Sequence, residues 1–361
     1  MHFYEKVIIA RFNVKRIRIS TWLLIGYDKI VALFTNHANV TLSIIHSCID
    51  ADMRQVDDVI RRSLHSEVVL INQVAEYIIN SGGKRLRPML VLLSAGLFGR
   101  IQPQHHQLAA VVEFIHTATL LHDDVVDESS KRRGKSTANA IFGNAASVLV
   151  GDFVYSRAFQ MMVAVQNMRV MEVLSDATNV IAEGEVLQLL NIHNADITDE
   201  AYLRVIHYKT AKLFEAATKL GAIISNADTQ DEAALTAYGM HLGTAFQLID
   251  DVLDLSGNAE DIGKNLGDDL AEGKPTLPLL YAMHHSTPEE SRLIRDTIEQ
   301  GGLQHLTQII DIVKNSGALQ HVKVLAGIES AACRAKIAHF PDSAFKQALI
   351  SLAEFAVQRN F

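Results

Sequence analysis

The stretch LLHDDVVDESSKRRGKST, Leu120–Thr137, ends an apolar run with three aspartates and then continues with a cluster of cations. The aspartates are Asp123, Asp124 and Asp127, at positions i, i+1 and i+4. On a helix, residues i and i+4 share a face, so two of the carboxylates would point the same way about one turn apart. Carboxylates placed so repel each other unless a cation lies between them. The stretch predicts a divalent-cation site at a helix end; a solvated helix end is the alternative.

The composition is typical of a helical globular protein. The chain has 361 residues, is 48% hydrophobic and contains only six prolines. From Asp50 onward, apolar residues recur at spacings of three and four, and some segments are apolar nearly all round, as in buried helices. No strand-like alternation or fixed repeat is visible. We therefore expect a large single all-α domain over residues 49–361. The net charge of −8 argues against nucleic acid as a partner.

The first 48 residues differ from the rest of the chain. They hold six Lys and Arg against two Asp and Glu, and their two apolar runs, TWLLIG and KIVALF, are shorter than the roughly 20 residues of a membrane span. We expect a poorly ordered extension over residues 1–48, or a start codon placed too far upstream, and no transmembrane segment. An organelle presequence or an amphipathic anchor is the alternative. The two distant cysteines, Cys48 and Cys333, fit a cytoplasmic location.

A second acidic cluster repeats the first. In GTAFQLIDDVLD, the residues Asp250, Asp251 and Asp254 again lie at i, i+1 and i+4 near the end of an apolar helical run. Two such clusters are hard to explain by solvation alone. Facing each other across a cavity, they would form a cage of oxygen ligands for Mg²⁺, which typically completes its shell with substrate phosphate. The pair predicts a magnesium–diphosphate site with more than one ion.

A basic turn and a histidine accompany the acidic clusters. SGGKRLRP places Lys84, Arg85 and Arg87 beside two glycines, where cations and backbone N–H groups can converge on an anion. The turn lacks the spacing of a nucleotide-binding phosphate loop. His116 lies seven residues before Asp123 and so nearly on the same helical face. Taken alone, the turn would be a solvated basic turn and His116 a core residue.

Six motifs occur in a fixed order: GGKRLRP, LLHDDVVDESSKRRGK, EGEVLQL, KTAKLFEAA, GTAFQLIDDVLD and GKNLGDDLAEGKPTLPL. On these motifs, the chain from about residue 50 onward resembles the trans-prenyltransferases, the polyprenyl diphosphate synthase family, and most of all its long-chain, octaprenyl-type bacterial members. The resemblance implies an all-α bundle of the isoprenoid synthase type around a deep central cavity. It also implies Mg²⁺-dependent, head-to-tail condensation of isopentenyl diphosphate with an allylic diphosphate. Because the family is usually dimeric, we expect a homodimer.

The resemblance also implies a role for each matching residue. The metal ligands would be Asp123, Asp124, Asp127, Asp250, Asp251 and Asp254. The allylic diphosphate would be bound by Arg132, Lys209 and Lys264. Isopentenyl diphosphate would be bound by Lys84, Arg87, His116 and Arg133. The catalytic residues near the reacting carbons would be Lys209, Thr210 and Gln247. The extension before residue 50 departs from the family pattern, and no role is implied for it.

Product length would depend on the residues below the first acidic cluster, Thr119, Ala118 and Ile115. In short-chain relatives a bulky aromatic near this position closes the tunnel, whereas Ala118 and Thr119 are small. We expect elongation of farnesyl diphosphate to an all-trans C40 product, octaprenyl diphosphate, for a quinone side chain. Geranylgeranyl or solanesyl products are alternatives.

Three other classes of protein compete with this interpretation. A terpene cyclase or squalene-type synthase shares the aspartate-rich helices but does not need the basic turn and His116. A regulatory subunit of a heteromeric synthase would be expected to have lost motif aspartates, whereas all six are present. A helical scaffold with acidic helix ends would release no diphosphate in the presence of Mg²⁺.

Overall fold

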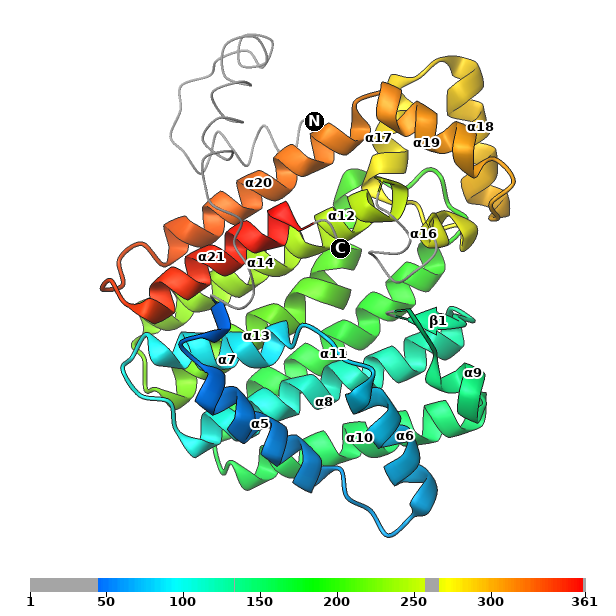
Figure 1. The fold of residues 1–361 in the computed structure, drawn as a ribbon. Coiled ribbons are helices and arrows are strands. Elements are labelled where there is room, and N and C mark those ends of the chain that lie inside the picture. Colours follow the sequence, from blue (N-terminus) through cyan, green and yellow to red (C-terminus); the bar gives the residue numbers. More distant parts are fainter. Residues whose placement is uncertain (1–44, 133, 257–265, 360–361) are drawn as a thin grey trace. The chain divides into compact units, whose positions relative to one another are not determined.

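The computed structural model describes residues 45–132, 134–256 and 266–359, and almost all of its regular structure is helical (Figure 1). In chain order, the helices up to residue 206 are α5 (Asp50–Ser63), α6 (Val69–Asn80), α7 (Leu86–Gly96), α8 (Pro103–Val126), α9 (Ala138–Phe142), α10 (Asn144–Ala164), α11 (Met168–Asn191) and α12 (Asp199–Ile206). A wide helical turn of the π type, η1 (His207–Ala211), follows α12. The helices after it are α13 (Lys212–Ile224), α14 (Thr229–Ser256), α16 (Asp268–Ala271), α17 (Leu277–His285), α18 (Pro288–Gln300), α19 (Leu306–Asn315), α20 (Ala318–Lys336) and α21 (Ala344–Gln358). The predicted all-α fold is confirmed.

One small sheet departs from the predicted pattern. Strands β1 (Lys131–Arg132) and β2 (Lys135–Ser136) pair as an antiparallel hairpin directly after α8. Gly134 between them has φ +73°, a left-handed conformation that costs glycine little. Strands of two residues carry no detectable alternation, so the sequence could not have indicated them.

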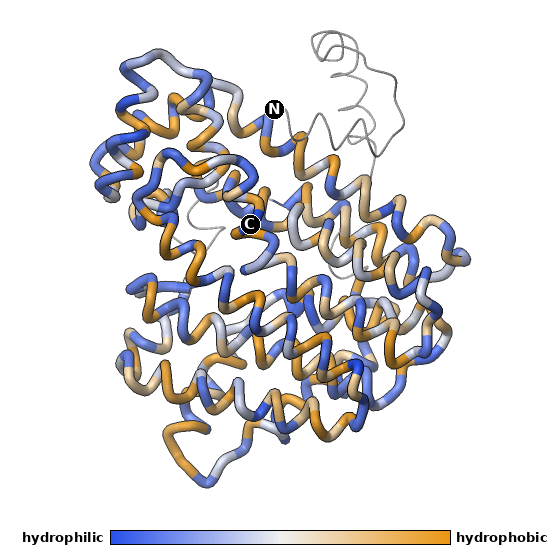
Figure 2. Tube along the Cα trace, turned by 180° about the vertical axis from the view of Figure 1, so that it is seen from behind, coloured by the Kyte–Doolittle hydropathy of each residue, from blue (hydrophilic) through white to orange (hydrophobic). Residues whose placement is uncertain are grey.

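The core consists of helices that bury most of their surface. In α7, every residue from Pro88 to Gly96 is buried, and α8 is buried along most of its length. Helix α8 packs against α7 and α10, whereas α14 packs against α13 and α20. Figure 2 shows apolar and polar residues mixed along most other helices, as expected where each helix turns one side to the core. The acidic stretches therefore belong to α8 and α14, two helices that supply many buried residues to this core.

Two glycines bring neighbouring helices close to η1. A Cβ added at Gly184 of α11 would lie 2.7 Å from the backbone nitrogen of Lys209, and one at Gly243 of α14 would lie 2.5 Å from the Cα of Ala211. Both distances are too short for a side chain. Glycine at these positions therefore allows α11 and α14 to pack closely against η1.

The predicted domain boundary can be examined only in part. The described residues from Ile45 onward form one compact unit, and Ile45 and Ile49 are both buried. The rest of the expected extension lies outside the described residues, so the boundary at residue 48 stays a prediction. Among the described helices, none is both long and apolar enough to cross a membrane.

Candidate active site

A cavity of about 730 Å³ collects most of the residues that the sequence predicts for the site. Its wall comes from the turn before α7, from α8, α11, α12, η1 and α14, and from the segment around α16. The predicted residues that line it are Lys84, Arg87, His116, Thr119, Asp123, Asp127, Arg132, Lys209, Thr210, Gln247, Asp250, Asp251 and Asp254. The fold thus joins motifs that lie far apart in the sequence.

Five other predicted residues are placed differently or not described. Asp124, Ala118 and Ile115 are buried but are not among the residues that line the cavity. Arg133 and Lys264 lie outside the described residues. The roles predicted for all the site residues, these five included, stay predictions.

The first acidic cluster lies where α8 ends. Asp127 is the C-cap of α8, and its N–H donates to the carbonyl of Asp123 at 2.8 Å. The side chains of both residues line the cavity: a carboxylate oxygen of Asp123 lies 3.8 Å from Nζ of Lys209, and one of Asp127 lies 3.2 Å from Nζ of Lys274. Burial raises the pKa of Asp123, and Lys209 offsets this effect only in part. Additional positive charge near Asp123 would therefore favour its ionised form.

Asp124 of the same cluster is buried behind the cavity surface and bonds to Arg132. It is 1% exposed, and its Oδ1 accepts a hydrogen bond of 2.7 Å from Nε of Arg132. The β1–β2 hairpin makes this contact possible because it folds the chain back over the end of α8. In this structure, Asp124 orients the guanidinium of Arg132 at the edge of the cavity.

The second acidic cluster is anchored by hydrogen bonds on α14. Asp251 is buried and accepts hydrogen bonds from the Tyr202 hydroxyl and from Nε2 of Gln247, the latter at 2.9 Å. Burial, and then the negative charge of Asp269, raise the pKa of Asp251 to about 8. Asp250 pairs with the guanidinium of Arg359. These contacts fix the orientation of the cluster at the cavity wall.

The wide turn η1 presents two more predicted residues to the cavity. A π-helix is a rare conformation that is frequent at functional sites. Nζ of Lys209 lies 2.6 Å from Oε2 of Glu185 and donates to Oε1 of Gln188 at 2.6 Å, while Thr210 donates to Oε1 of Gln247 at 2.9 Å. Thr210, Gln247 and Asp251 therefore form a continuous hydrogen-bonded chain from η1 to the second acidic cluster.

The cavity is also lined by polar and charged side chains to which sequence reasoning attached no role. Among them are Glu185, Gln188, Tyr202, Lys274 and Arg359. Three of them lie in quoted motifs, EGEVLQL and the GKPTLPL part of the last motif, so the signal was present but no role was attached to it. Tyr202 and Arg359 lie outside every motif, and only the fold brings them to the second acidic cluster.

Lys274 is the centre of a buried charge cluster. Its ammonium pairs with Glu272 and Asp127 and lies 4.0 Å from Asp269. Burial disfavours its charged form, but the carboxylates of Asp269, Asp127 and Glu272 outweigh burial, so that the pKa of Lys274 is raised. This one cation joins the end of α8 to the segment around α16.

The carboxylate set suits a hard divalent cation. Across the described ranges, no three His, Cys, Asp or Glu side chains are close enough to hold a metal ion, and Asp123, Asp127 and Asp250 pair with protein cations. The carboxylates of Asp123, Asp127, Asp250 and Asp251 nevertheless offer only oxygen donors and line one cavity. Burial disfavours the ionised form of Asp123 and of Asp251. Metal ions bridging to a diphosphate would relieve that penalty, so the residues fit Mg²⁺.

The comparison with known sequences decides the family, because residues 68–313 match the sequence model described as "Polyprenyl synthetase". The chain belongs to the polyprenyl synthetase family. It is a trans-polyprenyl diphosphate synthase, a prenyltransferase that elongates polyprenyl diphosphates. The enzyme class and the resemblance predicted from the motifs are confirmed.

Individual relatives cover nearly the whole described part of this family member. Octaprenyl diphosphate synthase of Escherichia coli is 54% identical over 310 residues, which cover 86% of this chain and 96% of the relative. The geranyl-diphosphate-specific all-trans-nonaprenyl-diphosphate synthase of Rhodobacter capsulatus is 45% identical over 309 residues, 85% of this chain and 95% of the relative. A crystal structure of polyprenyl synthase from Caulobacter crescentus, complexed with calcium and isoprenyl diphosphate, superposes with a TM-score of 0.87 at 43% identity and covers 90% of this chain and all of that one.

We predict that Lys274→Met reduces the rate of chain elongation by roughly tenfold or more and destabilises the fold, because a buried ion pair that loses one partner costs about 3–5 kcal/mol. Turnover and thermal unfolding of the purified variant measure the two effects. Lys323→Met removes an exposed lysine of α20 and serves as the control. Wild-type turnover and melting temperature in Lys274→Met would contradict the structural role of the cluster.

Proposed function

We propose that this enzyme elongates farnesyl diphosphate with isopentenyl diphosphate, in a Mg²⁺-dependent reaction, to all-trans octaprenyl diphosphate. The observation that carries the proposal is the single cavity that holds both aspartate-rich helix ends and the basic turn. The C40 product is supported by the relatives named octaprenyl diphosphate synthase, at 54% and 49% identity. A C45 product is the alternative, because a relative named nonaprenyl-diphosphate synthase follows at 45%.

The allylic diphosphate would bind between the two acidic clusters. The six aspartates would hold the magnesium ions. Four of them, Asp124, Asp127, Asp250 and Asp251, already accept hydrogen bonds within the protein. Bound Mg²⁺ would neutralise the charge that grows on the diphosphate as the allylic C–O bond breaks. Arg132 and Lys209, with Lys264 from outside the described residues, would bind the same leaving group from the protein side.

The side chains proposed to lie near the reacting carbons, Thr210 and Gln247, would contribute oxygen dipoles and would not act as nucleophiles. Gln247 is held at both ends, since its amide nitrogen donates to Asp251 and its oxygen accepts from Thr210. The hydroxyl and amide oxygens would place partial negative charge beside the allylic carbocation. Because these dipoles are already oriented, little reorganisation would be needed during the reaction.

Isopentenyl diphosphate would bind at the other side of the cavity. Lys84 and Arg87 come from the basic turn, and His116 comes from α8. Together with Arg133, they would bind the second diphosphate and direct its double bond toward the allylic carbon. The isopentenyl double bond would then attack the allylic carbocation left by the departing diphosphate, and the proton lost from the isopentenyl unit would go to an acceptor such as that released diphosphate. The cavity would also exclude water, which would quench the cation.

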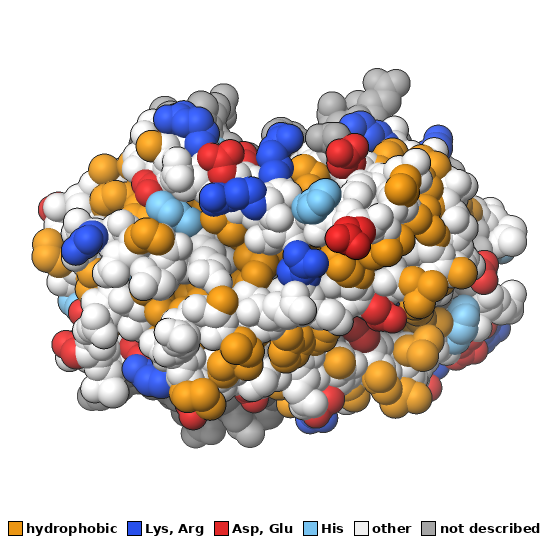
Figure 3. All heavy atoms as spheres, turned by 90° about the horizontal axis from the view of Figure 1, so that it is seen from below, with side chains coloured by type: hydrophobic (Ala, Val, Ile, Leu, Met, Phe, Trp, Pro, Cys, Tyr) orange, Lys and Arg blue, Asp and Glu red, His pale blue; other side chains and the backbone are white. Residues whose placement is uncertain are grey.

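A homodimer is part of the proposal and is supported by exposed apolar side chains on two neighbouring helices. Helices α10 and α11 expose the large apolar residues Val148, Leu149, Val163, Val186, Leu189 and Leu190. Figure 3 views the side on which α6 and α10 lie in Figure 1 and shows many apolar side chains on that surface. Large apolar side chains exposed together are typical of protein interfaces, so we place the dimer contact on these two helices. A cytoplasmic location, which the two distant cysteines favour, and use of the product in a quinone side chain, which the family resemblance implies, are parts of the same proposal.

Incubation with farnesyl diphosphate, labelled isopentenyl diphosphate and Mg²⁺ should yield a ladder of products that ends at C40. Chromatography of the dephosphorylated products reads the length, and excess chelator should abolish the whole ladder. A ladder that ends at C20 or C45 would contradict the assigned length but not the reaction. No product with Mg²⁺ present would favour a regulatory subunit instead.

Ala118→Phe should shorten the product by roughly two or more isoprene units, because an aromatic ring one turn below the first acidic cluster would block a growing chain. The same chromatography measures it. Ala118→Ser changes the volume little and should retain the wild-type length. Since Ala118 is fully buried, the melting temperature of each variant is measured alongside. A folded, active Ala118→Phe enzyme with wild-type products would contradict the predicted tunnel.

Light scattering of the purified chain should give about twice its mass of 39.8 kDa. Leu189→Glu places a charge on the exposed apolar surface of α11 and should shift the enzyme toward the monomer. Leu303→Glu, at an exposed apolar residue outside α10 and α11, is the control. A monomeric wild type would contradict the proposed homodimer.

A further inference from the structure

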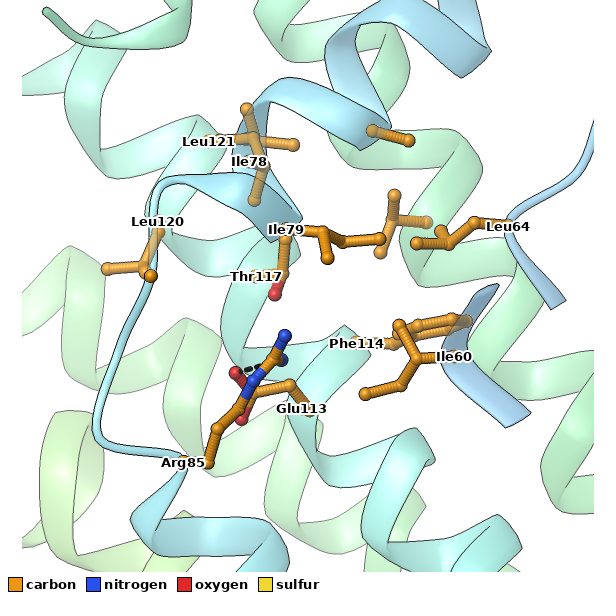
Figure 4. Close-up of a pocket in the computed structure, with 13 residues that line it drawn as sticks. Ile60, Leu64, Ile78, Ile79, Arg85, Glu113, Phe114, Thr117, Leu120 and Leu121 are labelled. Carbon is orange, nitrogen blue, oxygen red and sulfur yellow. Dashed lines mark hydrogen bonds and ion pairs between the residues drawn. The ribbon is translucent and has the colours of Figure 1, made fainter. Parts of the chain in front are cut away.

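The basic turn contains a third cation that lies between two cavities. Arg85 lines the large cavity and also a small pocket of about 30 Å³ beside it. Figure 4 shows the guanidinium of Arg85 pointing toward Glu113 of α8, with the apolar side chains of Ile60 and Phe114 on the far side of the small pocket. Arg85 and Glu113 therefore form part of the partition between the two spaces.

The contact between these two side chains is short and largely shielded from water. Nη1 of Arg85 donates to Oε1 of Glu113 at 2.7 Å, and the two side chains are only 19% and 10% exposed. At this depth, an ion pair is screened little by salt. Loss of either member would leave a charge without its partner, which disfavours the arrangement that the pair now stabilises.

The backbone of Arg85 shows that the turn is held in a special conformation. Arg85 has φ +51° and ψ +34°, in the left-handed region that non-glycine residues rarely adopt. Gly82 and Gly83 before it also have positive φ, but they are glycines. Arg85 is the N-cap of α7, and its carbonyl accepts the N–H of Met89 at 3.1 Å. A strained residue persists only where its surroundings over-determine it, and the ion pair to Glu113 is one such restraint.

The pair connects the two segments that would bind isopentenyl diphosphate. Lys84 and Arg87 flank Arg85 on the turn, whereas Glu113 lies three residues before His116 and thus on a neighbouring face of α8. We propose that the Arg85–Glu113 ion pair is a positioning pair, which sets the basic turn against α8 so that Lys84, Arg87 and His116 converge on the diphosphate of isopentenyl diphosphate. This inference rests on the function proposed above.

Steady-state kinetics of Glu113→Gln and Arg85→Gly test the proposal. Glutamine keeps the shape of Glu113 without its charge, and glycine suits the left-handed backbone while removing the guanidinium. Each variant should raise KM for isopentenyl diphosphate roughly tenfold, with KM for farnesyl diphosphate changed less than about twofold. The double variant should resemble the single variants, because the two side chains act as a unit. Added guanidinium should lower KM of Arg85→Gly.

Controls separate positioning from general stability and from failure of the proposed function. Glu232→Gln neutralises a carboxylate of another interhelical ion pair, with Arg169, that does not line the cavity, and it should leave both KM values unchanged. Wild-type KM for isopentenyl diphosphate in Glu113→Gln, or an equal rise in both KM values, would overturn the proposal. If Arg85→Gly does not fold, Glu113→Gln decides alone. Absence of turnover in the wild type would refute the proposed function itself, which the variants do not test.

Discussion

The arrangement of the active site depends on the pairing of buried carboxylates with buried cations. Lys209 lies between α8 and α11, Lys274 joins the end of α8 to the segment around α16, and Arg132 bonds Asp124 from the hairpin. Each of these pairs crosses from one element to another, so the charges also fix the geometry of the cavity. Removing water makes such pairing strong and makes its loss costly. An enzyme that elongates polyprenyl diphosphates must hold diphosphate groups, and in this cavity the cations and the acids keep each other in place.

The scaffold supports this electrostatic arrangement by close helix packing. Glycines on α11 and α14 bring both helices against η1, and that contact places Lys209 and Thr210 opposite side chains of the same two helices. The hydrogen-bonded chain from Thr210 through Gln247 to Asp251 then connects η1 with an acidic cluster. Helices rather than loops therefore carry most of the side chains in this part of the cavity, and in the proposed reaction they would keep those dipoles oriented.

Much of the fold and site followed from the sequence, for identifiable physical reasons. The apolar helices and the acid pairs at i and i+4 are local patterns that can be read from the sequence. The six motifs in their fixed order indicated most of the other residues that the structure brings to the cavity. What could not be predicted depends on contacts distant in sequence. Arg359 pairs with Asp250, and Tyr202 donates a hydrogen bond to Asp251, although these partners are far apart in the sequence. Asp124 bonds Arg132 because the β1–β2 hairpin folds the chain back, and its two-residue strands are too short to show periodicity. The π conformation at Lys209 was equally hidden, because its residues are ordinary helix formers.

The π-helix has a consequence for how this chain can vary. Helix α12, η1 and α13 follow one another without a break from Asp199 to Ile224. A π-turn holds one residue more than the α-turn it replaces, so deleting a single residue from η1 would restore a regular α-helix and leave the faces of α12 and α13 nearly unchanged. The same deletion within α12 or α13 would rotate the two parts of the continuous helix by about 100° relative to each other, since each residue advances an α-helix by that angle. A deletion between Tyr202 and η1 would therefore turn Tyr202 away from the second acidic cluster. This segment can lose a residue at η1 more easily than elsewhere along its length, but the loss would remove the wide turn that presents Lys209 and Thr210 to the cavity.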